Sequence, residues 1–364
     1  MIKKTLIGKI LLLALLFTLT ACSKDDANEP KDNTPEEEEP VFERNFNITA
    51  DLSDPSANES AKALYSWMRN QFGKKVLSGQ TFTDEYWDYI KGLTGKTPLI
   101  MELDFQTYSP MYPYLWDSQC NCQTFGPDPE SKITEKAIDW YNKNEKKPII
   151  KFQWHWHSPM GGQPGKNTFY TDQTTFDVRQ AVIEGTPEYQ ATIRDIDAIA
   201  VQLNRLQDQG IAVLWRPLHE FDGGWFWWSA HGAEPAKKLW NIMYDRLTKY
   251  HNLHNLIWIW NGDKKDWYVG NDKCDIVTAD IYGTAFVYKT SEDEFNTLYR
   301  ISDGTKMIGI SENGTIPNVA QALQDGVSWG FFITWQDHLF KSNSDEQILR
   351  VFNNPNVITL ENYN

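Results

Sequence analysis

The chain has 364 residues, enough for one large domain or two ordinary ones, and its formal net charge of -14 argues against nucleic-acid binding, which needs a basic face. Its 16 Trp and 16 Tyr are many for this length and suggest that some rings serve a ligand rather than a core. The sequence shows no internal repeat and no sign of a second domain.

The N-terminus reads as a targeting segment over residues 1–21. Lys3 and Lys4 supply a charged start, and the apolar stretch at 10–19 is too short for a membrane span. The letters LTAC, ending at Cys22, resemble the lipobox of bacterial lipoproteins. That resemblance implies cleavage before Cys22 and attachment to a membrane by acyl chains on its sulfur. Ordinary secretory cleavage near Ala21 is the alternative.

Residues 22–40 read as an acidic, disordered tether. Three prolines and a run of four glutamates, with almost nothing apolar, keep such a segment extended and unfolded. Its acidic start at 23–26, SKDD, is similar to the export signal of surface-exposed bacterial lipoproteins. We therefore expect an outer-membrane lipoprotein that faces outward from the cell surface, with a single catalytic domain at 41–364.

From residue 41 onward, short apolar runs alternate with helical patterns. The runs predict strands at 76–80, 99–104, 149–154, 211–214, 256–260, 276–281, 307–311 and 330–334. The helical patterns fall at 58–72, 84–93, 133–145, 187–209, 235–250, 291–300, 317–324 and 345–352. This alternation predicts an α/β fold, a closed (β/α)8 TIM barrel. An open doubly wound sheet is the alternative, which the lack of a glycine-rich phosphate loop disfavours.

The stretch at 211–229, IAVLWRPLHEFDGGWFWWS, organises the candidate site. A buried strand runs into Arg216, His219 and Glu220, and aromatic residues from Trp225 onward follow a Gly-Gly pair. Polar clusters at the C-terminal ends of strands are where α/β barrels place their chemistry. Aromatic walls beside a carboxyl group suit a sugar, whose C–H face packs on rings while its hydroxyls need polar partners.

A second glutamate, Glu312, ends another predicted strand. It lies 92 residues after Glu220, about three βα units of ~31 residues each, so the two carboxyls would face each other across the barrel mouth. Such a pair is the machinery of glycoside hydrolysis. Beside Trp225, Glu220 should hold its proton, whereas Glu312 near Arg216 and Tyr282 should stay charged.

Several motifs resemble one family. WRPLHEFDGGWFWW at 215–228 closely resembles the hallmark of glycoside hydrolase family 26, the β-mannanases of clan A. LSGQ, WHWHSP, DWYVGND, SENG and TWQDH, at the other strand ends, are similar to that family as well. The resemblance runs from about residue 58 to 354. It implies a retaining endo-β-1,4-mannanase that acts on mannan, galactomannan or glucomannan, works as a monomer and uses no cofactor.

Carried over by position, the resemblance makes Glu220 the acid/base and Glu312 the nucleophile. The substrate-binding residues that it implies are His155, Arg216, His219, Trp225, Tyr282 and Trp335. Trp225 would pack across the bond to be cut, and Trp335 would lie under the sugar under attack. Ser158, Ser229 and Asp222 depart from the residues usual in the family, which affects the detail of sugar binding.

Other functions and sites remain as alternatives. The same family contains β-1,3-xylanases and lichenases, and a non-catalytic glycan-binding lipoprotein would also use aromatic platforms. His155 and His157 could suggest a metal site, but the later strand ends offer no further ligands for one, so we expect none. Because one residue separates Cys120 from Cys122, a loop between them would be strained, and pairing of either with Cys274 stays open.

Overall fold

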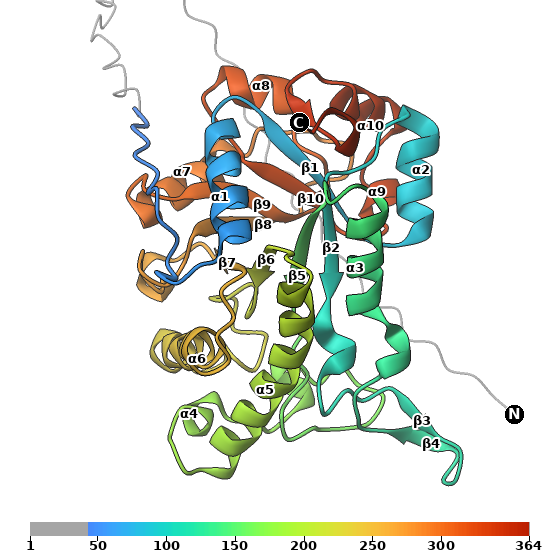
Figure 1. Cartoon of the computed structure of the whole chain (residues 1–364), viewed down its shortest axis with the longest axis vertical. Helices are drawn as coiled ribbons and strands as arrows, with labels where there is room; N and C mark the ends of the chain where they lie inside the picture. The colour runs from blue at the N-terminus through green and yellow to red at the C-terminus, as the bar shows by residue number, and fades with distance from the viewer. Residues whose placement is uncertain (1–42, 364) are drawn as a thin grey trace, which may run out of the picture. The chain divides into compact units, whose positions relative to one another are not determined.

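Eight parallel strands close into a barrel within residues 43–363, the part of the chain that this computed structural model describes. In order around the barrel they are β1 (Val76–Thr81), β2 (Ile100–Asp104), β5 (Ile149–Gln153), β6 (Val213–Arg216), β7 (Leu256–Asn261), β8 (Ile276–Ile281), β9 (Met307–Asn313) and β10 (Phe331–Thr334) (Figure 1). β10 returns to pair with β1, placing Leu77 opposite Phe331 and Gln80 opposite Thr334. The predicted (β/α)8 TIM barrel is confirmed, and the open-sheet alternative is wrong.

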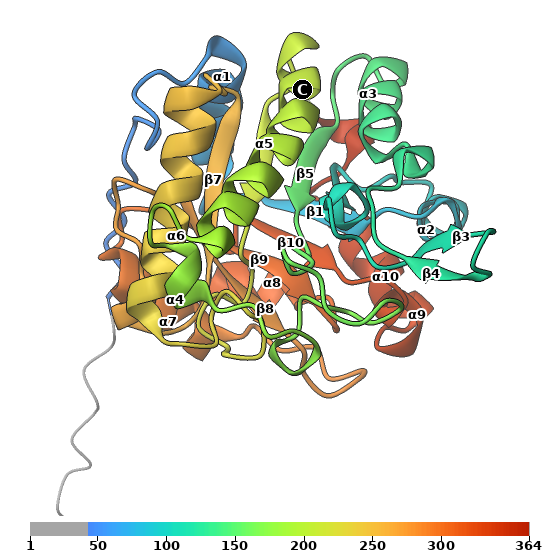
Figure 2. The ribbon, with the colours of Figure 1, turned by 90° about the horizontal axis from the view of Figure 1, so that it is seen from below.

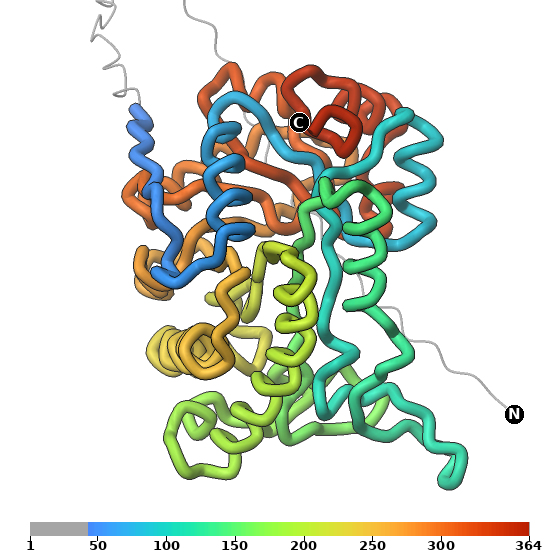
Figure 3. Tube along the Cα trace, viewed as in Figure 1, coloured from blue at the N-terminus to red at the C-terminus, as the bar shows by residue number. Residues whose placement is uncertain are grey.

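Helices lie outside the strands, as Figure 2 shows, and the chain path in Figure 3 advances around the barrel in sequence order. The longer ones are α1 (Glu59–Gln71), α2 (Asp84–Thr94), α3 (Ile133–Lys143), α5 (Pro187–Asp208), α6 (Ala233–Asp245), α7 (Glu292–Ser302), α8 (Val319–Gln324) and α10 (Asp345–Phe352). α5 shows why they form: Thr186 caps its first turn, Pro187 opens it, and Ile196 and Leu203 are buried on one face.

Alternation along the strands separates two apolar layers. In β6, Val213 and Trp215 pack outward against the helices, whereas Leu214 belongs to a second buried cluster that also contains Ile257 of β7. One step further along the inward face comes Arg216, at the C-terminal end of β6. The side-chain period of two therefore turns an apolar strand interior into a polar one at the barrel mouth.

Some boundaries differ from the prediction. The helix expected at 235–250 is α6 followed by a π-helical turn at Arg246–Tyr250, and β6 begins two residues later than the apolar run. Short elements that the sequence did not suggest are α4 (Val178–Ala181), α9 (His338–Lys341) and β11 (Val357–Ile358), which pairs with the start of β1. Among the described residues, no helix is both long and apolar enough to span a membrane.

A hairpin of β3 (Leu115–Asp117) and β4 (Cys122–Thr124) corrects the expectation for the cysteines. Cys120 and Cys122 form a disulfide with each other, and Cys274 is a buried free thiol. Asn121, between the two cysteines, adopts a left-handed backbone with φ 53°, a conformation that Asn tolerates better than most residues. The hairpin stands out from the barrel in Figure 1.

Residues from Arg44 onward form one compact unit. The expected targeting segment at 1–21, the lipidation site at Cys22 and the tether at 22–40 lie outside the described residues, so they stay predictions.

Candidate active site

Glu312 lies near the end of β9 with both carboxylate oxygens occupied. Arg216 Nη1 donates to its Oε1 at 2.6 Å, and the Tyr282 hydroxyl donates to its Oε2 at 2.6 Å. Burial and the Glu312 charge raise the pKa of Tyr282, so the phenol keeps the proton that it donates. Glu312 is 4% exposed, and hydrogen bonds from a cation and a phenol favour its ionised form and fix its direction.

The guanidinium of Arg216 joins Glu312 to the neighbouring strand ends. It also donates to Gln153 Oε1 at 2.5 Å and Asn261 Oδ1 at 2.9 Å, and it forms an ion pair with Asp280. Burial opposes its charge, but Asp280 and Glu312 outweigh burial and raise the pKa of Arg216. One buried guanidinium thus pairs with two carboxylates from adjacent strands, and these contacts hold Arg216 in one position.

Glu220 follows β6 in a loop with an unusual backbone. Leu218 has φ 48° and Glu220 itself φ 47°, a left-handed region that side-chain-bearing residues adopt only when their surroundings hold them there. The Glu220 N–H donates to Asn261 Oδ1 at 2.5 Å, and Trp225 Nε1 donates to Glu220 Oε2 at 2.6 Å. Burial and the charge of Glu312 raise the pKa of Glu220, which favours its protonated form.

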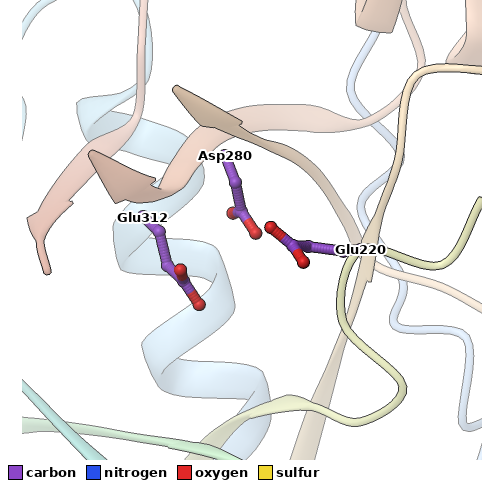
Figure 4. A group of neighbouring side chains, drawn as sticks. All are labelled: Glu220, Asp280 and Glu312. Carbon is purple, nitrogen blue, oxygen red and sulfur yellow. The ribbon is translucent and has the colours of Figure 1, made fainter. Parts of the chain in front are cut away.

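Figure 4 shows the carboxyl groups of Glu220, Asp280 and Glu312 turned toward one another at the barrel mouth. One oxygen from each lies within 4.8 Å of the other two. Carboxyl pairs about 5–5.5 Å apart allow direct attack on a sugar, whereas about 6.5–9.5 Å leaves room for an intervening water. The spacing of Glu220 and Glu312 therefore suits direct attack.

The same three carboxylates have the spacing of a metal site, so their other partners decide what they fit. Asp280 and Glu312 share the guanidinium of Arg216, and Tyr282 donates to Glu312. A cation already occupies the place between two of the three carboxylates. This donor set fits an ion-paired carboxylate cluster better than an open cation site.

The two histidines named from the sequence lie side by side. His155 Nε2 and His219 Nε2 are 3.1 Å apart, and the His155 Nδ1 is bonded to the carboxylate of Asp104. His157 belongs elsewhere: its ring is buried and bonds Thr168 Oγ1 at 3.1 Å. Burial lowers the pKa of His157 to about 3, so it is a neutral core residue. The rings of His155 and His157 therefore do not converge on one point as two metal ligands would.

Two separate hollows are lined by residues of the predicted site. A cleft of about 690 Å³ contains His155, Trp335 and Tyr170 in its lining, together with Gln153. A second hollow of about 440 Å³ is lined by Glu220, Trp225 and Asp280, together with residues of the loops after β6 and β7 and of helix α7. Trp225 is 49% exposed, as a ring awaiting a ligand would be.

Each residue predicted from the sequence, Cys22 apart, is therefore found at the barrel mouth. The partners of Asp104, Asn261 and Asp280 were not predicted from the sequence: these residues bind His155, the Glu220 backbone and Arg216, respectively. The signal that could have found them is their position at strand ends: Asp104 and Asn261 are the last residues of β2 and β7, and Asp280 is the last but one of β8.

Residues 53–362 match the profile of Glycosyl hydrolase family 26. A mannan endo-1,4-beta-mannosidase of Thermothelomyces thermophilus is 40% identical over 326 residues, 86% of this chain and 63% of that protein. Mannan endo-1,4-beta-mannosidase A of Piromyces sp is 37% identical over 320 residues, covering 85% and 50%. The chain thus spans between half and two thirds of the length of these curated relatives.

Solved structures agree with the profile. The Podospora anserina GH26-CBM35 beta-(1,4)-mannanase superposes with a TM-score of 0.78 at 37% identity, over 88% of this chain and 70% of that one. A beta-mannanase from a symbiotic protist of the termite Reticulitermes speratus, complexed with gluco-manno-oligosaccharide, gives 0.77 at 33% identity, over 88% and 99%. A shared profile, shared sequence and shared barrel together place the chain in one group: it belongs to glycosyl hydrolase family 26.

Proposed function

We propose that this protein is a retaining endo-β-1,4-mannanase. The observation that carries the proposal is the contrast between two nearby carboxyl groups. Glu312 is held by Arg216 and Tyr282 as an anion, whereas burial and the Glu312 charge raise the pKa of Glu220. A carboxylate bonded by a cation and a phenol, beside a carboxyl group whose raised pKa favours its proton, suits double displacement at an anomeric carbon.

In the first step, Glu312 attacks the anomeric carbon while Glu220 gives its proton to the departing glycosidic oxygen. The C–O bond to the leaving sugar breaks, a C–O bond to Glu312 forms, and Glu220 is left as a carboxylate. Arg216 keeps its bonds to Asp280 and Gln153, so the guanidinium stays in place while Glu312 gives up its charge. The Tyr282 hydroxyl can keep its hydrogen bond to Glu312 Oε2 during this step.

In the second step, Glu220 acts as the base. It takes a proton from water, the hydroxyl oxygen attacks the anomeric carbon, and the bond to Glu312 breaks with its electron pair returning to the carboxylate. Two inversions leave the product with the configuration of the substrate. Both carboxyls end in their starting protonation states, and neither step calls for a cofactor.

The choice of a β-mannan as substrate rests on the family and on the names of the relatives, which are mannan endo-1,4-beta-mannosidases. Two separate hollows, one lined by Trp335 and the other by Trp225 and Glu220, suit a polymer that extends beyond a single sugar. This favours cleavage at internal bonds. The exposed aromatic faces suit the C–H surface of a sugar.

Product profiles on mannan, galactomannan, glucomannan, xylan and lichenan test the proposal. We expect manno-oligosaccharides of mixed length from the mannans, with the β-anomer formed first when the reaction is followed by NMR. Faster release from β-1,3-xylan or lichenan would assign another activity of the same family. Binding to these polymers without any release of sugar would indicate a glycan-binding protein.

We also propose that the protein is an outer-membrane lipoprotein exposed at the cell surface. Support comes from the sequence: the apolar segment at 10–19, the LTAC motif ending at Cys22, and the acidic tether at 22–40. Cys22→Ser should move the protein from the membrane fraction to the soluble fraction while keeping its activity. A variant that still sediments with membranes would contradict attachment through Cys22, and resistance of the wild type to protease on intact cells would contradict surface exposure.

A further inference from the structure

Asp104, at the C-terminal end of β2, collects more hydrogen bonds than a packing role needs. Its Oδ1 accepts from the His155 N–H at 3.1 Å and the Gln106 N–H at 2.8 Å, and its Oδ2 accepts from Gln153 Nε2 at 3.3 Å. Oδ2 also bonds the ring nitrogen Nδ1 of His155. Burial alone would raise the pKa of Asp104, but His155 outweighs burial and the pKa lies below its ordinary value. Asp104 is therefore an anion that can only accept hydrogen bonds.

An accepting Asp104 fixes a proton on His155 Nδ1. The opposite nitrogen, Nε2, faces His219 Nε2 at 3.1 Å, and a hydrogen bond at that distance needs one N–H and one lone pair. The two rings therefore cannot both be imidazolium. Either His155 is charged and donates to a neutral His219, or His155 is neutral and accepts from a neutral or a charged His219.

The charges around the pair favour the first arrangement. The charged and titratable groups that act on the two rings are Asp104, Glu312, Glu220, Arg216, Lys151 and His157. Burial would lower the pKa of His155, but Asp104 outweighs it and raises that pKa. For His219, burial and then the charges of His155 and Arg216 all lower the pKa, well below its usual value.

We propose that Asp104 is a positioning residue that holds His155 as an imidazolium, and that this imidazolium in turn fixes His219 as a neutral ring in one tautomer. His219 immediately precedes Glu220, and its carbonyl accepts from Trp228 Nε1 at 3.1 Å. Its ring packs against Phe226, centroids 4.8 Å apart, and against Trp228 at 5.4 Å. A chain of contacts thus runs from β2, through both imidazoles, to the loop that carries Glu220.

The consequence concerns the cleavage point and rests on the proposed function. A neutral His219 spares Glu220 a second adjacent positive charge, which would lower the pKa of a carboxyl that must hold its proton. The hydrogen bond from His155 Nε2 to His219 Nε2 also fixes the orientation of the His219 ring. The positive charge stays on His155, where Asp104 neutralises it.

The test is ¹⁵N NMR of the full chain labelled at histidine, recorded across pH. At pH 7 we expect both ring nitrogens of His155 to be protonated and His219 to be a single neutral tautomer. In Asp104→Asn the amide oxygen can still accept from Nδ1, but the negative charge is lost. The pKa of His155 should then fall by about 1–3 pH units. Asp104→Glu, which restores the charge, should recover part of that shift.

A second Asp–His pair, outside the site, provides a matched control: Asp54 Oδ2 bonds His254 Nδ1 at 2.7 Å. Asp54→Asn removes a similar aspartate charge and should leave the titration of His155 unchanged. A wild-type His155 that is neutral at pH 7, a proton on His219 instead, or an unshifted titration in Asp104→Asn would overturn the proposal. If Asp104→Asn fails to fold, the wild-type spectrum alone decides. Because ring protonation is read without substrate, a protein that cleaves no mannan would refute the proposed function and leave this result intact.

Discussion

Tyr282→Phe isolates one hydrogen bond to Glu312. The phenol donates to Glu312 Oε2 at 2.6 Å, while its ring packs on His338 with centroids 5.2 Å apart, so the substitution removes the donor and keeps the packing. Hydrogen bonds to charged groups contribute about 1.5–3 kcal/mol. Glu312 loses its negative charge in the first step, so a hydrogen bond that only stabilised the charged carboxylate would slow the reaction. The Tyr282 hydrogen bond can therefore aid catalysis only by orienting Glu312.

Taken as lost orientation, that energy corresponds to a fall of about 10- to 150-fold in kcat/KM on an aryl β-mannoside. The midpoint of thermal unfolding should change little, because Tyr282 is 44% exposed. Tyr89→Phe is the matched control: Tyr89 donates to the carboxylate of Asp345 on the outer helices and should leave kcat/KM unchanged. A loss below twofold in Tyr282→Phe, or a gain, would refute the idea that this bond positions the nucleophile.

Three further predictions follow from the charges. Since burial and Glu312 raise the pKa of Glu220, activity should fall as pH rises through a value above the ordinary ~4.3, and Glu220→Gln should lose that alkaline limb on an aryl mannoside with a good leaving group. Hydrogen bonds from Lys91 and the Thr97 N–H lower the pKa of Glu361 to about 2. The stability that Glu361 contributes is therefore present above pH ~4.3 and lost as the pH falls toward 2. Glu361→Gln should lower the melting temperature at pH 7 but not near pH 2. Exhaustive chelation should leave kcat unchanged, and a loss restored by added metal would show that the carboxylate cluster works with a cation.

The sequence predicted the barrel well because each strand is a short apolar run followed by polar residues. The same pattern located Glu220 and Glu312, since the C-terminal ends of parallel barrel strands meet at one mouth. Lateral partners were harder to predict. Asp104 and His155 are 51 residues apart and meet because β2 and β5 pair, with Asp104 opposite Gln153.

Other features depend on local backbone that composition does not reveal. Asn121, inside the Cys120–Cys122 disulfide loop, has a left-handed backbone, as do Leu218 and Glu220 in the loop that carries the acid/base. A motif can name such residues, but it does not give their φ angles. Strand register and local backbone conformation, rather than residue type, therefore determine the parts of the site that the sequence did not predict.

The roles of the two glutamates are the central claim, and the stereochemistry of azide products tests it most directly. In Glu312→Ala, azide can occupy the space of the lost carboxylate and attack an aryl β-mannoside, giving the α-mannosyl azide, of inverted configuration. In Glu220→Ala, the glycosyl-enzyme still forms on Glu312, and azide releases it as the β-mannosyl azide, of retained configuration. Exchanged configurations in the two variants would contradict the assignment of Glu312 as nucleophile and Glu220 as acid/base.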